Sequence, residues 1–254
     1  MPVPSVLHRW LIDVSLATAL LTRVPAGQPA GVTPPDFARA VRAYPLIGAA
    51  IGAVSGAVML GALEIGMPPL VAACVALGVA VVITGGFHED GLADTADGFG
   101  GGRDAHAKLS IMRDHRIGSY GTLAITLTLL VQAGALAALE AHAWTALIAA
   151  HAVSRAVLGG LLAGLPPARG DGLARLIGRP SHGAATQSAC LGVLVVVLTA
   201  PSLAMAALIL AVAGATAWAM GLLAWRQIGG VTGDVCGASQ QAVAAAVLIA
   251  WSIR

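Results

Sequence analysis

The stretch Tyr44-Pro-Leu-Ile-Gly-Ala-Ala-Ile-Gly-Ala-Val-Ser-Gly-Ala-Val-Met-Leu-Gly-Ala-Leu63 contains no charged residue and is almost entirely apolar. Its length matches the roughly 20 residues that an α-helix needs to cross the hydrocarbon core of a bilayer. Gly48, Gly52 and Gly56 recur every fourth residue and would share one face of that helix. Small residues at this spacing let membrane helices approach closely. The segment therefore predicts a transmembrane helix that packs tightly against a neighbour.

Six further segments have the same apolar character. They are residues 69–87, 120–139, 143–164, 185–200, 202–225 and 235–253. An eighth apolar segment, residues 10–21, is shorter and contains Asp13. It is compatible with a short span, a re-entrant piece or a helix that lies in the membrane interface. We therefore predict an all-α, polytopic integral membrane bundle of about seven spanning helices plus a short N-terminal apolar helix, forming a single domain over residues 1–254.

The composition supports this prediction. The 254 residues are 57% hydrophobic and only 10% charged, whereas a soluble domain carries about 25% charged residues. A cytosolic enzyme, a disordered chain and a disulfide-stapled secreted module are thereby excluded. The formal net charge of +2 gives no indication of nucleic-acid binding. The three cysteines lie far apart and are expected to be buried apolar residues.

Basic residues occur in alternate loops along the chain. The turns at residues 64–68, 140–142 and 201 contain no Lys or Arg. The loops between them contain Arg23, Arg39, Arg42, Arg103, Lys108, Arg113, Arg116, Arg169, Arg175, Arg179 and Arg226. Because cytoplasmic loops of membrane proteins are enriched in Lys and Arg, this pattern predicts that the basic loops face the cytoplasm.

Half of the twelve carboxylates lie between Glu89 and Asp114. Within this segment Asp90, Asp94 and Asp97 follow i, i+4, i+7 spacing and would share one face of a helix. Carboxylates that close together repel one another, so a cation, a raised pKa or a basic partner must compensate. An all-oxygen set suits Mg²⁺, which binds a few carboxylates together with water and substrate phosphate. We predict these three aspartates as Mg²⁺ ligands, the alternative being an acidic surface loop.

Neighbouring residues are candidates for proton transfer. His88 and Glu89 lack the second histidine of a zinc-protease motif. We predict catalytic roles for His88, Glu89 and Asp114, without deciding which group is the base. A structural role for His88 is an equal alternative.

Several other polar residues are predicted to bind substrate. The guanidinium groups of Arg113 and Arg116 suit phosphate oxygens, although membrane anchoring also explains them. A helix that opens near Gly118 would direct free N–H groups toward an anion. Arg155 lies inside a predicted span, where a charge is costly and usually functional. The full set of predicted substrate-binding residues is Arg23, Arg113, Arg116, Ser119, Tyr120, Arg155, Thr232 and Asp234.

These polar residues gather at one face of the predicted bundle. A transporter would be expected to place them near the middle of the membrane, on broken helices. Phosphate chemistry at the membrane boundary is therefore favoured over transport. The loop 168–178 repeats the Asp-Gly-Leu-Ala string that begins at Asp90, and we interpret this repeat as chance.

The string His88-Glu-Asp-Gly-Leu-Ala-Asp-Thr-Ala-Asp-Gly98, with Ile111-Met-Arg-Asp114 and Arg116-Ile-Gly-Ser-Tyr-Gly121, resembles the signature of the cobalamin synthase family, the adenosylcobinamide-GDP ribazoletransferases. The resemblance covers nearly the whole chain. It extends to residues 22–25, 44–48, 154–155 and 229–234. The chain departs from the family pattern at His115, which replaces a small polar residue, and at Gln240-Gln241, where an acidic residue often follows.

This resemblance implies a multi-pass, Mg²⁺-dependent enzyme of the cell inner membrane. Such an enzyme joins adenosylcobinamide-GDP to α-ribazole, or to its 5′-phosphate, and releases GMP. Membrane lipid and other enzymes of the corrinoid pathway are the further partners that it implies. The alternative is a CDP-alcohol phosphotransferase, but that family requires Ala-Arg after Asp-Gly-x-x, and no such arginine follows Asp90.

Overall fold

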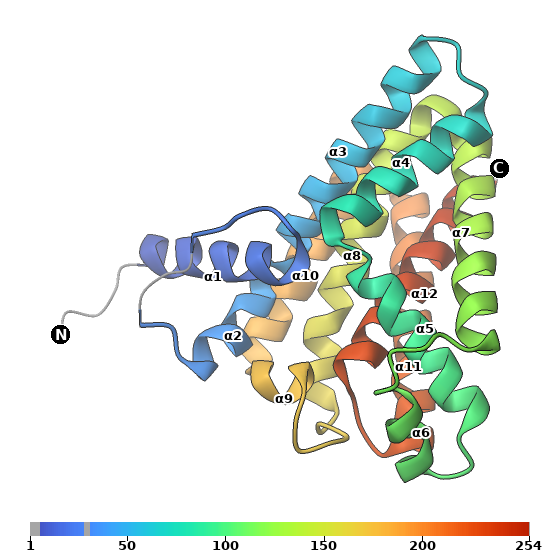
Figure 1. Cartoon of the computed structure of the whole chain (residues 1–254). Coiled ribbons are helices and arrows are strands. Elements are labelled where there is room, and N and C mark those ends of the chain that lie inside the picture. Colours follow the sequence, from blue (N-terminus) through green and yellow to red (C-terminus); the bar gives the residue numbers. More distant parts are fainter. Residues whose placement is uncertain (1–5, 28–30, 254) are drawn as a thin grey trace.

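The computed structural model describes residues 6–27 and 31–253, and these residues form helices joined by short loops (Figure 1). No β-strand forms within them, apart from a single isolated bridge between Pro167 and Val231. The helices are α1 (Val6–Leu21), α2 (Pro34–Ala40), η1 (Val41–Ala43), α3 (Tyr44–Glu64), α4 (Pro69–Thr84), α5 (Phe87–Gly101), α6 (Ala105–Ile111), α7 (Ser119–Leu139), η2 (Glu140–His142), α8 (Ala143–Gly164), α9 (Leu173–Ile177), α10 (His182–Thr199), α11 (Leu203–Ile228) and α12 (Gly233–Ser252).

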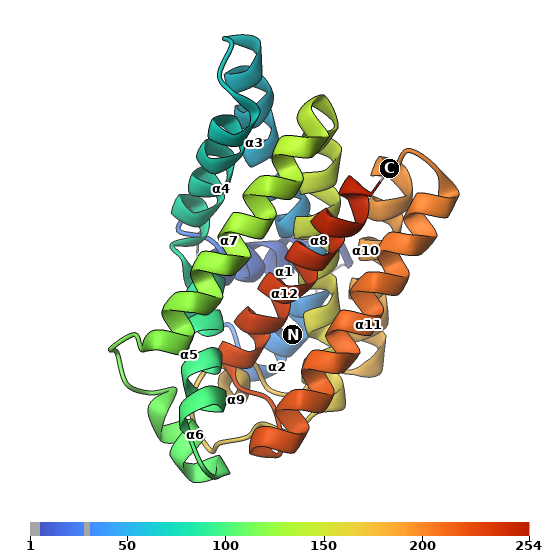
Figure 2. The same cartoon turned by 90° about the vertical axis from the view of Figure 1, so that its right-hand side faces the viewer.

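The long helices lie side by side in one bundle (Figures 1 and 2). Among the described residues, five helical stretches are long and apolar enough to cross a membrane, or six if α4 and α5 count as one broken span. One of the five, Ser119–Gly164, contains both α7 and α8, and the chain reverses between them at η2 (Figure 1). The predicted all-α membrane bundle is confirmed at this level. The expected number of about seven spans stays a prediction.

Helix α8 forms the centre of the bundle and packs against α3, α10 and α12. Most of its side chains are buried, and many of them are alanine. Gly48, Gly52 and Gly56 of α3 face this helix, where an added Cβ would overlap Trp144, Leu147 or His151. The close helix contact predicted from the glycine spacing is therefore confirmed.

The predicted span 69–87 is wrong at its C-terminal end. Helix α4 ends at Thr84, and Gly85 and Gly86 both adopt left-handed backbone conformations, with φ of 71° and 70°. Glycine takes up this conformation without the steric penalty of a Cβ. The helix axis turns by 91° at this point. As a result α5 leaves the apolar α4 and lies outside the five candidate spans.

Helix α1 lies across the bundle rather than along it (Figure 1). The expected N-terminal apolar helix is confirmed. It is held by Asp13, whose fully buried carboxylate pairs with Arg39 at 2.9 Å and Arg42 at 2.6 Å. Arg42 also stacks on the ring of Trp10, 4.0 Å from the ring centroid. A buried carboxylate needs such partners, so these contacts fix α1 against the bundle.

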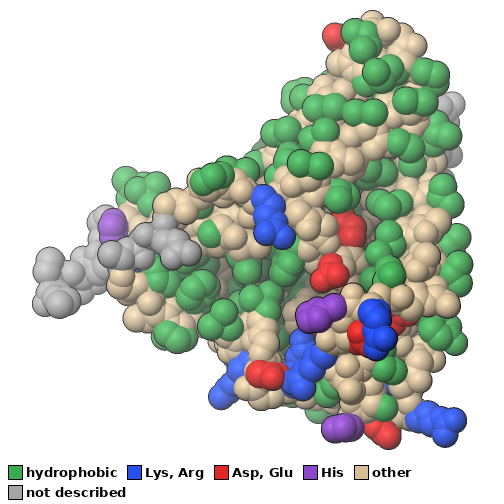
Figure 3. Space-filling model, in the orientation of Figure 1, with side chains coloured by type: hydrophobic (Ala, Val, Ile, Leu, Met, Phe, Trp, Pro, Cys, Tyr) green, Lys and Arg blue, Asp and Glu red, His purple; other side chains and the backbone are tan. Residues whose placement is uncertain are grey.

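Charged side chains are concentrated at the end of the molecule that contains α5, α6 and α9, whereas the opposite end is mostly hydrophobic (Figure 3). This concentration of charge at one end agrees with the occurrence of Lys and Arg in alternate loops of the sequence.

The prediction that the cysteines are buried is wrong for Cys74 and Cys190, which are exposed. Cys74 lines a groove between α4 and α7. Cys236 is half-buried, and all three are free thiols.

Candidate functional site

Helix α5 carries the acidic motif, as the i, i+4, i+7 spacing required. Asp90, Asp94 and Asp97 of α5 form an acidic cluster together with Asp234, and Asp94 lies at its centre. Its pKa is raised to about 7 by partial burial and by the negative charges of Asp90, Asp234 and Asp97. Three carboxylates from α5 and one from the start of α12 therefore share one electrostatic environment. Such an arrangement favours a bound cation or proton over four free negative charges.

Asp97 also links α5 to the start of α7. Its carboxylate accepts hydrogen bonds from the backbone N–H groups of Gly118, at 2.7 Å, and Gly121, at 2.9 Å. The helix opening at residue 118 therefore does bind an anion, as its sequence suggested, but this anion is the protein's own side chain. The contact brings the exposed residues Ser119 and Tyr120 next to the acidic helix.

The donor chemistry of this cluster fits a hard divalent cation, because its side chains offer only carboxylate oxygens. In the part of the chain that the structure describes, no three His, Cys, Asp or Glu side chains are already arranged to hold a metal ion. Each oxygen of Asp97 retains a lone pair beside the hydrogen bond that it accepts. A cation would therefore have to draw these carboxylates together.

A chain of ion pairs runs along the edge of the cluster. Arg169 donates to Asp234 at 3.1 Å, and its Nε lies 3.8 Å from a carboxylate oxygen of Asp171. Asp171 in turn accepts from Nη2 of Arg113 at 2.6 and 2.8 Å. Arg169 and Asp171 were not among the predicted site residues. The Asp-Gly-Leu-Ala repeat in their loop, which we interpreted as chance, is the feature of the sequence that could have indicated them.

Thr232 and Asp234 belong to the site through the first turn of α12. Thr232 caps this helix by accepting from the N–H of Val235, and its hydroxyl also donates to Asp234 at 3.2 Å. The backbone of Asp234 packs directly on Gly91 of α5, where a Cβ would come within 2.8 Å of its carbonyl oxygen. The glycine thus lets the two helices bring their carboxylates together.

Asp114 and Arg116 lie on the exposed loop before α7. They pair with each other at 3.0 Å, and Arg116 is 89% exposed. The hydrogen bond from Arg116 lowers the pKa of Asp114. Arg23 lies at the bend before α5, since its backbone N–H donates to Ile83 at 2.7 Å and its side chain contacts Gly85. All three are accessible to a ligand at the polar end.

His88, Glu89 and Arg155 lie in the interior instead. His88 is 1% exposed, and neither ring nitrogen has a hydrogen-bond partner among the described residues. It borders a small cavity lined largely by apolar side chains, including Leu158 and Leu162. Burial, the charge of Arg155 and His151 together hold the pKa of His88 well below its usual value. The structure therefore separates the buried His88 from the partly exposed carboxylates of the acidic cluster.

Glu89 and Arg155 belong to a buried polar network. Glu89 accepts from Gln241 at 2.8 Å, and Gln241 accepts from Gln132 at 3.0 Å. Arg155 is 1% exposed and contacts the ring of His151 at 2.9 Å. Burial raises the pKa of Glu89, and the nearby charge of Arg155 partly opposes this rise. The network connects α5 to α7, α8 and α12.

Gln132 and the glutamine pair at residues 240–241 were not predicted as supports of the site. Gln240 donates to Ser154 at 2.9 Å, so both members of the pair are bound within the interior. The sequence did offer an indication of this role, because these glutamines are polar residues within otherwise apolar segments.

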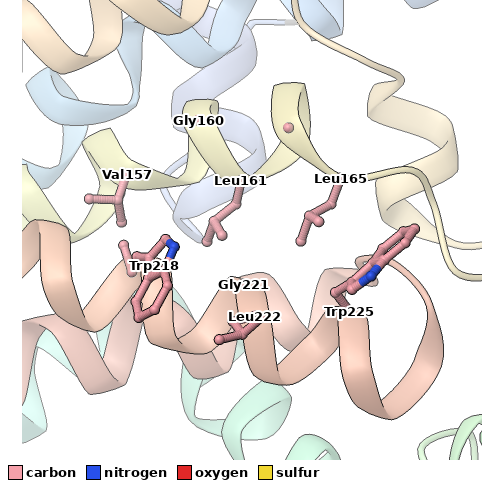
Figure 4. Close-up of a pocket in the computed structure, with 10 residues that line it drawn as sticks. Val157, Gly160, Leu161, Leu165, Trp218, Gly221, Leu222 and Trp225 are labelled. Atoms are coloured by element: carbon pink, nitrogen blue, oxygen red, sulfur yellow. The ribbon is translucent and has the colours of Figure 1, made fainter.

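A separate groove lies between α8 and α11 (Figure 4). Its volume is about 510 Å³, and Trp218 and Trp225 line it together with leucines and glycines. None of the described residues that line this groove is charged. It therefore cannot perform the phosphate chemistry that the acidic cluster favours.

Comparison with known proteins identifies relatives along nearly the full chain. Residues 13–252 match the family described as cobalamin-5-phosphate synthase. The adenosylcobinamide-GDP ribazoletransferase of Azorhizobium caulinodans is 46% identical over 245 residues, which cover 92% of each chain. The protein of the same name from Mesorhizobium japonicum is 42% identical, over 96% of this chain and 93% of the relative. The one from Xanthobacter autotrophicus is 45% identical, over 92% and 93%. No solved structure gives a significant match. The acidic helix, its arginine-bearing loops and this full-length similarity together show that the chain belongs to the cobalamin-5-phosphate synthase family.

Proposed function

We propose that this chain is a transferase that joins adenosylcobinamide-GDP to α-ribazole, or to α-ribazole 5′-phosphate, and releases GMP. Its relatives carry the name adenosylcobinamide-GDP ribazoletransferase. The observation that carries the proposal is the meeting of Asp90, Asp94, Asp97 and Asp234 beside Arg169, at the polar end of an apolar bundle. A pyrophosphate substrate needs such a combination of cation-binding carboxylates and guanidinium groups.

In the proposed reaction a ribose hydroxyl of the acceptor attacks the phosphorus linked to cobinamide. A new P–O bond forms, the bond from that phosphorus to the bridging pyrophosphate oxygen breaks, and GMP leaves with the electron pair. The hydroxyl proton passes to a base of the protein. We place this base in the acidic cluster, because His88 is buried and Asp114 is engaged with Arg116. The protein's contribution is mainly positioning and charge stabilisation.

We further propose Mg²⁺ as the cofactor, held by Asp90, Asp94 and Asp97. When bound, the ion would neutralise charge that develops on the pyrophosphate. The raised pKa of Asp94 supports this assignment, since partial burial and the negative charges of its neighbours both disfavour a bare carboxylate there. Asp97 would serve both the ion and the start of α7.

The accessible polar residues around the cluster are the proposed substrate contacts. Arg113 and Arg116 are suited to phosphate oxygens because guanidinium groups donate several hydrogen bonds in a fixed geometry. Arg23, Ser119 and Tyr120 are exposed and are proposed to contact the remainder of the substrates. Thr232 is only 1% exposed, so we propose that it acts through Asp234, to which its hydroxyl donates. Association with other corrinoid-pathway enzymes remains part of this proposal.

The decisive test measures GMP release from adenosylcobinamide-GDP by the full chain in membranes. GMP is expected only when both Mg²⁺ and α-ribazole, or its phosphate, are present. A chelator should stop the reaction, and added Mg²⁺ should restore it. A CDP-alcohol phosphotransferase would instead require a CDP-linked donor, and a transporter would release no GMP. Mg²⁺-independent GMP release would contradict the cofactor assignment alone.

We also propose that the protein lies in the inner membrane as a single domain, with the acidic helix facing the cytoplasm. The prediction concerns two cysteine variants in a background without Cys74, Cys190 and Cys236. An impermeant maleimide added to intact spheroplasts should label Ala141→Cys, which is exposed at η2, but not Ser110→Cys, which is exposed at α6. The positive-inside rule is the physical reason. Both cysteines should react after the membrane is permeabilised. Labelling of position 110 alone in intact spheroplasts would reverse the proposed topology.

A further inference from the structure

The carboxylate of Asp171 lies between two arginines that come from different loops. Arg113 donates to both of its oxygens, at 2.6 and 2.8 Å, and Nε of Arg169 lies 3.8 Å away. A phosphate group is recognised by the same arrangement of guanidinium donors. Asp171 therefore occupies the position that an anionic ligand would take.

Arg169 is held in place by its backbone. The N–H of Ala168 donates to Val231 at 2.9 Å, and the N–H of Val231 donates to Pro166 at 2.9 Å. These two hydrogen bonds join the loop of Arg169 to the loop that precedes α12. The side chain is only 15% exposed. Its position beside the acidic cluster is therefore fixed by the fold rather than by its ion pairs alone.

The hydrogen-bonding capacity of Arg169 is incompletely used. Its Nη2 donates to Asp234, but its buried Nη1 has no hydrogen-bond partner in residues 6–27 and 31–253. A buried donor without a partner is unfavourable, so a ligand that supplies an acceptor there would gain binding energy. Arg169 also acts electrostatically on Asp94, which places it next to the carboxylates proposed to hold Mg²⁺.

Asp171 itself is easily displaced. It is 66% exposed, and its partner Arg113 is 54% exposed. Ion pairs between exposed side chains contribute little net stability. A pyrophosphate carries more charge and more acceptor oxygens than one carboxylate, so its exchange for Asp171 is favourable.

We propose that Arg113 and Arg169 form the anion subsite for the pyrophosphate of the nucleotide substrate, and that Asp171 fills this subsite until the substrate displaces it. Arg169 is thereby added to the substrate-binding residues, and Asp171 acts as an internal competitor. The identification of the anion as a substrate pyrophosphate rests on the proposed function.

The test is a calorimetric titration of the full chain in lipid nanodiscs with inorganic pyrophosphate. Asp171→Asn should tighten pyrophosphate binding about threefold to tenfold, because the competing charge is removed. Asp104→Asn is the matched control, since it removes a carboxylate that caps α6 at the same end of the molecule. It should change the affinity less than about twofold, as expected for screened charges at a distance.

Variants of the arginines complete the experiment. Arg169→Gln should weaken pyrophosphate binding about tenfold or more, whereas Arg175→Gln in the neighbouring α9 should have little effect. The gain from Asp171→Asn should disappear when Arg113 and Arg169 are both glutamine. Thermal unfolding identifies any arginine variant that is misfolded, and the exposed Asp171→Asn then decides the matter by itself.

The outcomes separate this subsite from the proposed function. Equal pyrophosphate affinities of Asp171→Asn and Asp104→Asn would overturn the subsite, as would a wild-type chain that does not bind pyrophosphate. A wild-type chain that binds pyrophosphate with the expected pattern but releases no GMP would retain the subsite and refute the proposed reaction. In an active enzyme, Asp171→Asn should also lower KM for adenosylcobinamide-GDP more than it changes kcat.

Discussion

Replacing Asp94 with asparagine is expected to lower product formation from adenosylcobinamide-GDP and α-ribazole by about 10²- to 10³-fold or more. The side chain keeps its shape but loses the negative charge at the centre of the acidic cluster. Asp94 is the carboxylate on which Asp90, Asp97 and Asp234 all act electrostatically. Its loss would therefore weaken Mg²⁺ binding more than the loss of a peripheral ligand. Product is measured in membranes at saturating substrate and over a range of Mg²⁺ concentrations.

This substitution should not lower the stability of the folded protein. The ionised form of Asp94 is destabilised by partial burial and by its like-charged neighbours, and both raise its pKa. Asparagine removes the repulsion, so the unfolding temperature of the variant should equal or exceed that of the wild type. Asp104→Asn makes the same chemical change on the cap of α6 and should retain full activity. Near-normal product from Asp94→Asn would refute the metal site.

The long helices could be predicted well because the bilayer imposes their length. Residues 143–164 were predicted as a span, and α8 covers Ala143–Gly164. The span that was predicted over 69–87 differs because hydropathy measures apolar length and does not register backbone conformation. The pair Gly85-Gly86 is as compatible with an apolar segment as with the left-handed bend that the structure shows.

The placement of the aspartates on one face of the acidic helix was predictable because helical geometry fixes it. A period of 3.6 residues places Asp90, Asp94 and Asp97 on one face. The same geometry turns His88 by about 200° away from Asp90 and therefore toward the interior. The catalytic role of His88 stays a prediction, and this rotation favours the structural role that was its alternative. Its burial follows from the helical period once α5 is known to be a helix.

Contacts between distant loops could not be predicted from spacing. Asp97 meets Gly118, Arg113 meets Asp171, and Arg169 meets Asp234 only because several helices return to the same end of the bundle. A sequence pattern gives neighbours along one helix, but it does not say which loops share an end of the fold. The distribution of Lys and Arg placed these loops on the same side of the membrane, but it did not predict which of their residues are in contact.

Replacing Arg155 with methionine is expected to destabilise the protein by about 1.5 to 3 kcal/mol, because it removes the buried hydrogen bonds to His151 and the charge that acts on Glu89. Arg155 interacts electrostatically with Glu89 and contacts His151 at 2.9 Å, with 1% of its surface exposed. Chemical unfolding of the full chain in detergent micelles measures the loss. Arg226→Met, at the exposed end of α11, is the control and should change stability little.

A double variant separates charge from packing. Arg155→Met combined with Glu89→Gln should recover much of the lost stability, since the amide can bond to Gln241 without an opposing charge. Activity should recover in parallel if the network serves to position α5 and its aspartates.

A direct contact between Arg155 and substrate predicts a different pattern. Arg155→Lys would then leave unfolding unchanged while raising KM, and the double variant would remain as inactive as Arg155→Met. The buried position of Arg155 favours the first pattern, because a substrate that reached it would have to enter between α5, α8 and α12. Recovery of kcat in the double variant would therefore assign Arg155 to the support of the acidic helix rather than to the substrate.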